Sequence, residues 1–316
     1  MAIIGFDLGG TKMFALALGD NGEVLLRKKQ KVGDRRDNDA ATEAIGNLVE
    51  EIADEISEKV TSIGIAVPGP IDFKNGIILR TPNLGLADLP LRDLLSERFS
   101  VPVFLENDVN AGIYGEYRAG AAKGYSHVVG LFPGTGFGGG LILDGRLYRG
   151  ATGGAGEIGH MTVNIGGRRC NCGNFGCLEA VAARPAVAKD LAGAALAGDA
   201  PTVFEEAGSD IGAIRSGTIR RALENGDQAA GPILDQMAFY LGVGMANCVN
   251  IFDPEIIVVG GGVVEKLGKT LLGPAEATMR ERALPRLVEH VRVAVAVLGD
   301  DATALGAAYL AGEEAG

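Results

Sequence analysis

Hydrophobic positions along this chain form two patterns, short apolar runs and longer stretches with an apolar residue at every third or fourth position. The runs predict buried strands at 2–6, 13–18, 62–67, 101–105, 126–132, 141–143, 255–259 and 291–298, and a further strand is expected at 23–29. The periodic stretches predict helices at 42–56, 89–99, 111–119, 184–197, 215–225, 233–250 and 301–311. This alternation of strands and helices is typical of an α/β protein.

A glycine turn interrupts the first two strands at Asp7-Leu-Gly-Gly-Thr-Lys12. Gly9 and Gly10 allow backbone N–H groups to point toward a bound anion, and Thr11 and Lys12 add side-chain donors. Asp7 is a hard carboxylate ligand of the kind that Mg²⁺ prefers. The segment therefore predicts a phosphate-binding loop, with an ordinary glycine turn in a hairpin as the alternative.

A second glycine turn follows the strand at 126–132 and reads Pro133-Gly-Thr-Gly-Phe-Gly-Gly-Gly140. It satisfies the dinucleotide pattern G-x-G-x-x-G, but that pattern requires a helix after the glycines, and here a strand and a hairpin turn follow. A better comparison is internal, because 5–11 and 130–136 both place a glycine turn between two apolar strands. The chain therefore looks like two related halves, whose phosphate-binding hairpins are expected to face each other across a cleft.

Polar groups also follow other predicted strands, at the ends where open α/β sheets bind ligands. Gly69 lies in a Pro-Gly-Pro turn, and Asn83 lies in a polar loop at 81–84. Glu106-Asn107-Asp108 comes between a strand and a helix, which suits Asp108 as a general base and equally as a helix cap. Gly260, Gly261 and Gly262 come between a strand and a helix, an arrangement that suits a nucleotide.

Three of the four cysteines are clustered, with the spacing C-x-C-x4-C at Cys170, Cys172 and Cys177, and His160 lies shortly upstream. Three thiolates and one imidazole predict a closed tetrahedral Zn²⁺ site of the structural kind. Such a site would brace Glu157 and Glu179, which flank it in the sequence. The alternatives are one disulfide with a free thiol, or three buried cysteines. The fourth cysteine, at position 248, lies among apolar neighbours and is interpreted as a buried structural thiol.

Composition narrows the class of protein further. The chain has 316 residues, enough for one large or two ordinary domains, and 47% of them are apolar. Its net charge of -11 repels phosphate backbones, so nucleic acid is not expected as a partner. The amino-terminal residues lack the basic region of a signal peptide, and no apolar run reaches the length of a membrane span. We therefore expect a cytoplasmic enzyme without membrane contact.

Taken together, the motifs resemble the ROK family of bacterial sugar kinases and repressors, and within it the glucokinases most. They are D-x-G-G-T-K at 7–12, E-N-D at 106–108, G-T-G at 134–136, G-E-I-G-H at 156–160, the cysteine motif at 170–179 and G-G-G at 260–262. The resemblance spans nearly the whole chain and implies a duplicated, actin-like and ribonuclease-H-like α/β fold. It also implies a small domain of residues 1–118 plus 302–316 and a larger domain of residues 119–301 that carries the zinc site.

Residue roles carry over from the resemblance position by position. The family's catalytic base falls on Asp108. Its sugar contacts fall on Gly69, Asn83, Asn107, Asp108, Glu157, His160 and Glu179. Its phosphate loops fall on Gly9, Gly10, Thr11, Lys12, Thr135 and Gly136, and its adenosine contact falls on Gly260, Gly261 and Gly262. The zinc histidine of this family can touch metal and sugar through opposite ring nitrogens. The chain departs from the family pattern at 164–169, near the sugar.

The resemblance implies phosphorylation of glucose at the 6-hydroxyl, with ATP, Mg²⁺ and a structural Zn²⁺, in a homodimer or a dimer of dimers. Mannose, fructose, N-acetylglucosamine and N-acetylmannosamine are the alternative substrates. A sugar-sensing ROK regulator is a second class, disfavoured because such proteins carry a helix-turn-helix before D-x-G-G-T, and six residues precede Asp7 here. A third is an acidic zinc-knuckle interaction protein, which would need neither Asp108 nor the phosphate loops.

Overall fold

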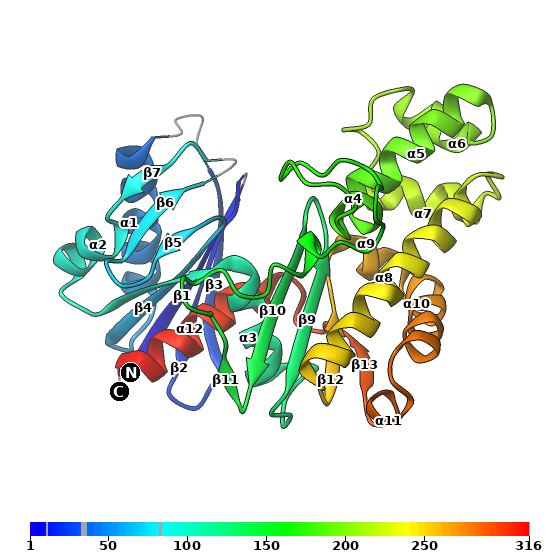
Figure 1. Ribbon diagram of the computed structural model, residues 1–316. Helices are drawn as coiled ribbons and strands as arrows, with labels where there is room; N and C mark the ends of the chain where they lie inside the picture. Colours follow the sequence, from blue (N-terminus) through cyan, green and yellow to red (C-terminus); the bar gives the residue numbers. More distant parts are fainter. Residues whose placement is uncertain (11, 33–36, 82–83, 316) are drawn as a thin grey trace. The chain divides into compact units, whose positions relative to one another are not determined.

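The computed structural model describes residues 1–10, 12–32, 37–81 and 84–315 (Figure 1). The chain forms two compact units. Unit 1 comprises Met1–Gly124, Arg146–Ala155 and Val297–Gly316, and unit 2 comprises Tyr125–Gly145 and Gly156–Ala296. The domain limits expected from the sequence, after residue 118 and before residue 302, stay a prediction.

Unit 1 is built on a sheet with the strand order β3-β2-β1-β4-β8. The strands are β1 (Ala2–Leu8), β2 (Lys12–Gly19), β3 (Val24–Lys31), β4 (Val60–Val67) and β8 (Val103–Asn107). β1 is antiparallel to β2 and parallel to β4, and β4 is parallel to β8. The carboxyl ends of β1, β4 and β8 therefore meet at one edge of the sheet, which carries Asp7, Gly69 and Asn107.

Helices cover both faces of this sheet. They are α1 (Asn38–Glu55), α2 (Leu91–Phe99), α3 (Asp108–Ala119) and α12 (Ala302–Ala315). Ile45 and Leu48 of α1 belong to the same buried cluster as Phe6 of β1. On the opposite face α12 packs so closely that a Cβ at Gly5 would lie 2.0 Å from the Ala304 carbonyl oxygen. Glycine at this strand position is therefore a packing requirement.

A small three-stranded sheet, β5 (Ile71–Asp72), β6 (Ile77–Arg80) and β7 (Ala87–Leu89), lies between β4 and α2 in the chain. The sequence did not predict it, because its strands have only two to four residues. It also corrects a boundary: the helix expected from residue 89 begins at Leu91, since Leu89 pairs with Ile78 of β6.

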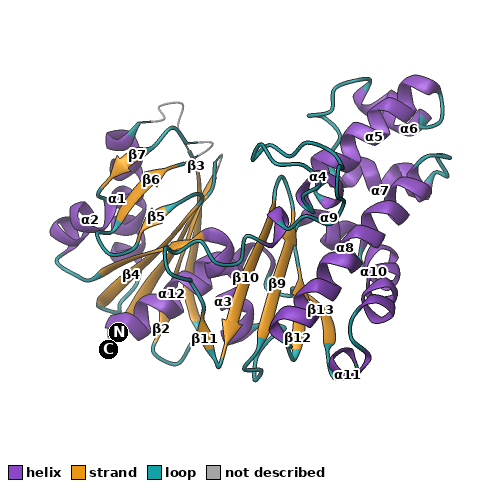
Figure 2. Cartoon of the chain, in the orientation of Figure 1, coloured by secondary structure: helices purple, strands orange, loops and turns teal. Residues whose placement is uncertain are grey.

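Unit 2 repeats the topology of unit 1 around strands in the order β10-β9-β12-β13 (Figure 2). The strands are β9 (Val128–Pro133), β10 (Phe137–Leu143), β12 (Ile256–Val259) and β13 (Arg292–Val295), whereas β11 (Arg146–Leu147) belongs to the unit 1 segment Arg146–Ala155. β9 is antiparallel to β10 and parallel to β12, and β12 is parallel to β13. These relations match those of β1, β2, β4 and β8. The predicted duplication is therefore confirmed.

Helices supply most of the core of unit 2. They are α4 (Glu179–Ala182), α5 (Arg184–Ala197), α6 (Pro201–Ala207), α7 (Ser216–Glu224), α8 (Ala230–Phe252), α9 (Gly262–Leu267), α10 (Lys269–Arg282) and α11 (Pro285–Val288). Met237 and Leu241 of α8 are fully buried in the cluster that contains Val129 of β9. Among the helices of the described residues, none is both long and apolar enough to cross a membrane.

Candidate functional site

Asp108 is the first residue of α3, directly after the carboxyl end of β8. The cap of this helix is Asn107, whose Oδ1 accepts hydrogen bonds from the backbone N–H groups of Val109 at 2.9 Å and Asn110 at 3.2 Å. Asp108 is partly buried, and its Oδ1 accepts a hydrogen bond from the N–H of the adjacent Val109 at 2.9 Å. The capping role left open by the sequence therefore belongs mainly to Asn107.

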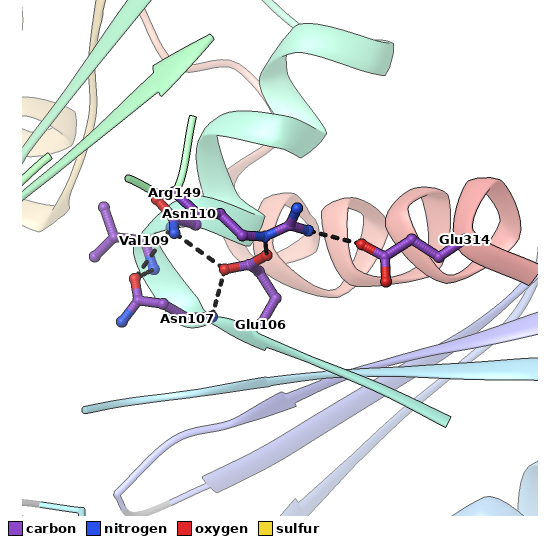
Figure 3. Close-up of polar contacts among 6 residues, drawn as sticks. All are labelled: Glu106, Asn107, Val109, Asn110, Arg149 and Glu314. Carbon is purple, nitrogen blue, oxygen red and sulfur yellow. Dashed lines mark hydrogen bonds and ion pairs between the residues drawn. The ribbon is translucent and has the colours of Figure 1, made fainter. Parts of the chain in front are cut away.

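Glu106, the residue before this pair, is a buried carboxylate at the centre of an ion network (Figure 3). Its Oε1 accepts from the backbone N–H of Asn107 at 2.9 Å and from Nδ2 of Asn110 at 3.0 Å. Its Oε2 accepts from Nε of Arg149 at 2.6 Å, and Arg149 reaches Glu314 of α12 at 2.9 Å. The network fixes the backbone that presents Asn107 and Asp108, because it ties the end of β8 to α12 and to the segment 146–155.

The first glycine turn joins β1 to β2. A Cβ at Gly9 would lie 2.7 Å from the Lys12 carbonyl oxygen, so only glycine fits there. Gly10 is partly buried beside it, and the Lys12 side chain is exposed. Thr11 and Asn83, both predicted site residues, lie outside the described residues.

Asp7, at the end of β1, has its pKa raised to about 7 by burial and by the negative charges of Asp108 and Asp300. Asp108 and Asp300 therefore lie close enough to Asp7 to repel its negative charge. A divalent cation would relieve this repulsion, and carboxylate oxygens are the ligands that Mg²⁺ prefers. The donor set fits the Mg²⁺ predicted at Asp7.

We expect the free energy of unfolding of the metal-free protein to fall, relative to that of Asp7→Asn, as pH rises from about 4 to about 7. The carboxyl has a pKa near 3.8 in the unfolded chain and near 7 in the folded protein, so within this window the folded state binds more protons and loses stability as pH rises. The loss is at most about 1.4 kcal/mol per pH unit. Urea denaturation across this range with a chelator measures it. The control is Asp54→Asn, at an exposed position of α1. If the difference in free energy of unfolding between the unmodified protein and Asp7→Asn does not change with pH, the raised pKa of Asp7 is contradicted.

The second glycine turn, Gly134–Gly136, joins β9 to β10 in unit 2. It is closed by a hydrogen bond from the Gly134 N–H to the Gly136 carbonyl oxygen at 2.8 Å. Oε2 of Glu179 accepts from the Phe137 N–H at 2.9 Å, directly after the turn. Thr135 is exposed at the tip. Glu179 therefore fixes the base of the hairpin and leaves its tip open to a ligand.

The third glycine turn, Gly260–Gly262, follows β12. It packs against the carboxyl end of β9, from which the second glycine turn starts. A Cβ at Gly261 would lie 2.7 Å from the Pro133 carbonyl oxygen, and a Cβ at Gly260 would lie 2.7 Å from the Phe132 ring. The two glycine turns of unit 2 are thus adjacent. This adjacency is what a nucleotide site shared by the two turns requires.

The predicted metal ligands come together in one cluster. The ligand atoms of His160, Cys170, Cys172 and Cys177 all lie within 4.8 Å of one another. The Sγ atoms of Cys172 and Cys177 are 3.7 Å apart, close to the spacing of about 3.8 Å that tetrahedral Zn–S bonds of about 2.3 Å require. A disulfide would bring them to about 2.05 Å, so the zinc interpretation fits and the disulfide alternative does not.

His160 presents its two ring nitrogens to different groups. Nδ1 is 3.8 Å from Cys170 Sγ, and Nε2 is 3.8 Å from a carboxylate oxygen of Glu157. Oε1 of Glu179 is 3.3 Å from the same cysteine sulfur. Three predicted sugar contacts of unit 2, Glu157, His160 and Glu179, therefore lie at the cluster. The sequence predicted that the metal site would brace Glu157 and Glu179.

Sequence reasoning missed the part that Arg149 plays. A glutamate at the end of a buried strand signals that a cation is required, because a buried charge without a partner is costly. The signal does not identify which cation, since Arg149 follows Glu106 by 43 residues and lies outside every motif.

A hairpin followed by parallel strands, present twice and combined with three glycine turns and a Cys₃His cluster, defines a duplicated α/β fold of the kind found in actin-like sugar kinases. The ROK family model matches residues 3–314. The chain belongs to the ROK family.

The relatives of this chain include both glucokinases and xylose repressors. A glucokinase of Thermotoga maritima is 35% identical over 100% of this chain and 99% of its own length. A xylose repressor of Caldicellulosiruptor bescii is 31% identical over 96% of this chain and 76% of its own length. The solved structure of a ROK family glucokinase from Streptomyces griseus, in complex with glucose and AMPPNP, is 32% identical with a TM-score of 0.81 and covers 99% of this chain and 100% of that one.

Proposed function

We propose that this protein is a glucokinase that transfers the γ-phosphoryl group of Mg·ATP to the 6-hydroxyl of glucose. The observation that carries the proposal is the place of Asp108, a partly buried carboxylate at the junction of β8 and α3 that is not needed as the helix cap. Full-length similarity to a glucokinase supports the same assignment.

Asp108 would accept the proton of the sugar 6-hydroxyl as that oxygen attacks the γ-phosphate. Beside it, Asn107 uses its Oδ1 for the helix cap, and among the described residues its Nδ2 group has no hydrogen-bond acceptor. That group can therefore donate to a sugar hydroxyl. The other sugar contacts that we assign are Gly69, Asn83, Glu157, His160 and Glu179.

Phosphoryl transfer depends mainly on alignment and on stabilisation of the spreading negative charge. We assign the phosphate contacts to Gly9, Gly10, Thr11, Lys12, Thr135 and Gly136, and the adenosine contact to Gly260, Gly261 and Gly262. Mg²⁺ at Asp7 would neutralise part of the phosphate charge. The Cys₃His cluster leaves no open coordination position, so the zinc it suits is structural.

The test is kcat/KM for glucose, mannose, fructose, N-acetylglucosamine and N-acetylmannosamine with Mg·ATP. We expect glucose to give the highest value, because glucokinases are among the relatives that match nearly the whole chain. A hydroxyl that is moved, as in mannose, or replaced by an acetamido group leaves a buried polar group of the site without its partner. A competitor that exceeds glucose by tenfold, which is about 1.4 kcal/mol, would contradict glucose as the substrate and leave the kinase assignment intact.

Similarity to xylose repressors supports one other candidate, a sugar-sensing regulator. The same assay separates the two. Sugar binding by calorimetry without turnover of any of the five sugars would favour the regulator.

A further inference from the structure

Arg184, the first residue of α5, is attached to the second glycine turn of unit 2 by its backbone and by its side chain. Its backbone N–H donates to the Gly134 carbonyl oxygen at 3.0 Å, and its Nη2 donates to Thr135 Oγ1 at 3.3 Å. Its Nη1 donates to the Ile214 carbonyl oxygen at 3.2 Å. The guanidinium is therefore held between the hairpin tip and the loop before α7.

This arginine has no carboxylate partner among the residues that the structure describes. Four other arginines of unit 2 do have one: Arg168 pairs with Asp190, Arg220 with Glu224, Arg221 with Glu206 and Arg280 with Glu276. Further arginines of unit 2 also form no ion pair with the described residues, so what distinguishes Arg184 is its attachment to the glycine turn. The charge that faces Arg184 is instead the like charge of Arg215. Burial, and after it this like charge, lower the pKa of Arg184. Two adjacent cations cost free energy that a bound anion would recover.

The surroundings indicate which anion would fit. The Gly260–Gly262 turn packs on the same end of β9, and a Cβ at Gly262 would lie 3.7 Å from Oγ of Ser216, the residue after Arg215. The two arginines thus lie beside two adjacent glycine turns, where backbone N–H groups can approach phosphate oxygens. Thr135, which Arg184 contacts, is itself exposed at the hairpin tip.

We propose that Arg184, assisted by Arg215, binds the phosphate groups of the nucleotide donor. The proposal rests on the proposed function, because it assumes that a nucleotide occupies the Gly134–Gly136 turn. A guanidinium donates two parallel hydrogen bonds to a phosphate and keeps its charge at every physiological pH. Held against the hairpin, Arg184 also stabilises the negative charge that develops on the phosphates during transfer.

The experiment measures the dissociation constants of adenosine, ADP, ATP and inorganic tripolyphosphate, by calorimetry with Mg²⁺ and without sugar. The proteins are the full chain, Arg184→Met, Arg184→Lys, Arg215→Met and a control, Arg220→Met, at an exposed position of α7 where the arginine pairs with Glu224. Methionine preserves length and bulk and removes the charge.

For Arg184→Met we expect ADP and ATP affinity to fall by roughly 10- to 100-fold, which is the range for hydrogen bonds to charged groups. Adenosine affinity should stay within about twofold, because adenosine carries no phosphate. Arg184→Lys should recover part of the loss, and Arg215→Met should show a smaller one, because Arg215 is exposed. Arg220→Met should match the wild type.

Three results would overturn the proposal: an unchanged ATP affinity in Arg184→Met, an equal loss for adenosine and ATP, or tripolyphosphate binding by a wild type that does not bind ATP. Equal losses would mean that Arg184 only holds the loop before α7 against the hairpin. Failure of the proposed function gives a different result, namely Arg184-dependent ATP binding by a wild type that phosphorylates no sugar. That result supports the inference.

Discussion

Replacement of Asp108 by asparagine is expected to lower kcat by about 10²- to 10⁴-fold, the usual cost of losing a general base. Asparagine keeps the shape of the side chain, and its Oδ1 can still accept from the Val109 N–H. Asn107 continues to cap α3 in the variant. The helix and the sugar contacts should therefore survive, so the dissociation constant for glucose should stay within a few-fold.

The matched control is Asp93→Asn. Asp93 also lies in the first turn of a helix, α2, and its exposed side chain pairs with the neighbouring Arg92. Its replacement should leave kcat unchanged. Steady-state kinetics with a coupled assay and sugar binding by calorimetry give both numbers, and an Asp108→Asn enzyme within a few-fold of the wild-type kcat would refute the base assignment.

The duplicated sheet was predictable because its signals are local. Each half begins with two apolar strands joined by a glycine turn, and neighbouring strands in a hairpin pair without help from distant residues. The Cys₃His cluster was predictable for the same reason, since its ligands span only residues 160–177. The family assignment combined these local signals and is confirmed.

Features that depend on distant residues could not be predicted. Glu106, Arg149 and Glu314 meet only because β8, the segment 146–155 and α12 pack in one unit, and no spacing in the sequence encodes that meeting. The small sheet was missed because two to four residues are too few to show a period. Arg184 was assigned only to a helix, since its lack of a carboxylate partner appears only in three dimensions.

Loss of one zinc ligand is expected to produce the largest change in stability. The purified protein should contain about one zinc per chain, and Cys172→Ser should lose it together with roughly 10 °C or more of melting temperature. The physical reason is that the cluster connects three separate pieces of chain: the short 3-10 helix at Ile158–His160, the loop at 170–172, and Cys177, which lies just before α4. Metal analysis and thermal unfolding of chelator-free protein measure both effects.

Cys248→Ser is the control for this prediction. Cys248 is fully buried in α8, and burial raises the pKa of its thiol to about 12. The side chain therefore stays a neutral thiol, whereas a metal ligand is a thiolate. A serine there places a hydroxyl in an apolar site and should lower the melting temperature, while the zinc content stays unchanged. Zinc content therefore separates the two variants where stability alone does not. Freshly purified protein without zinc, or Cys172→Ser with its full zinc content, would contradict the metal assignment.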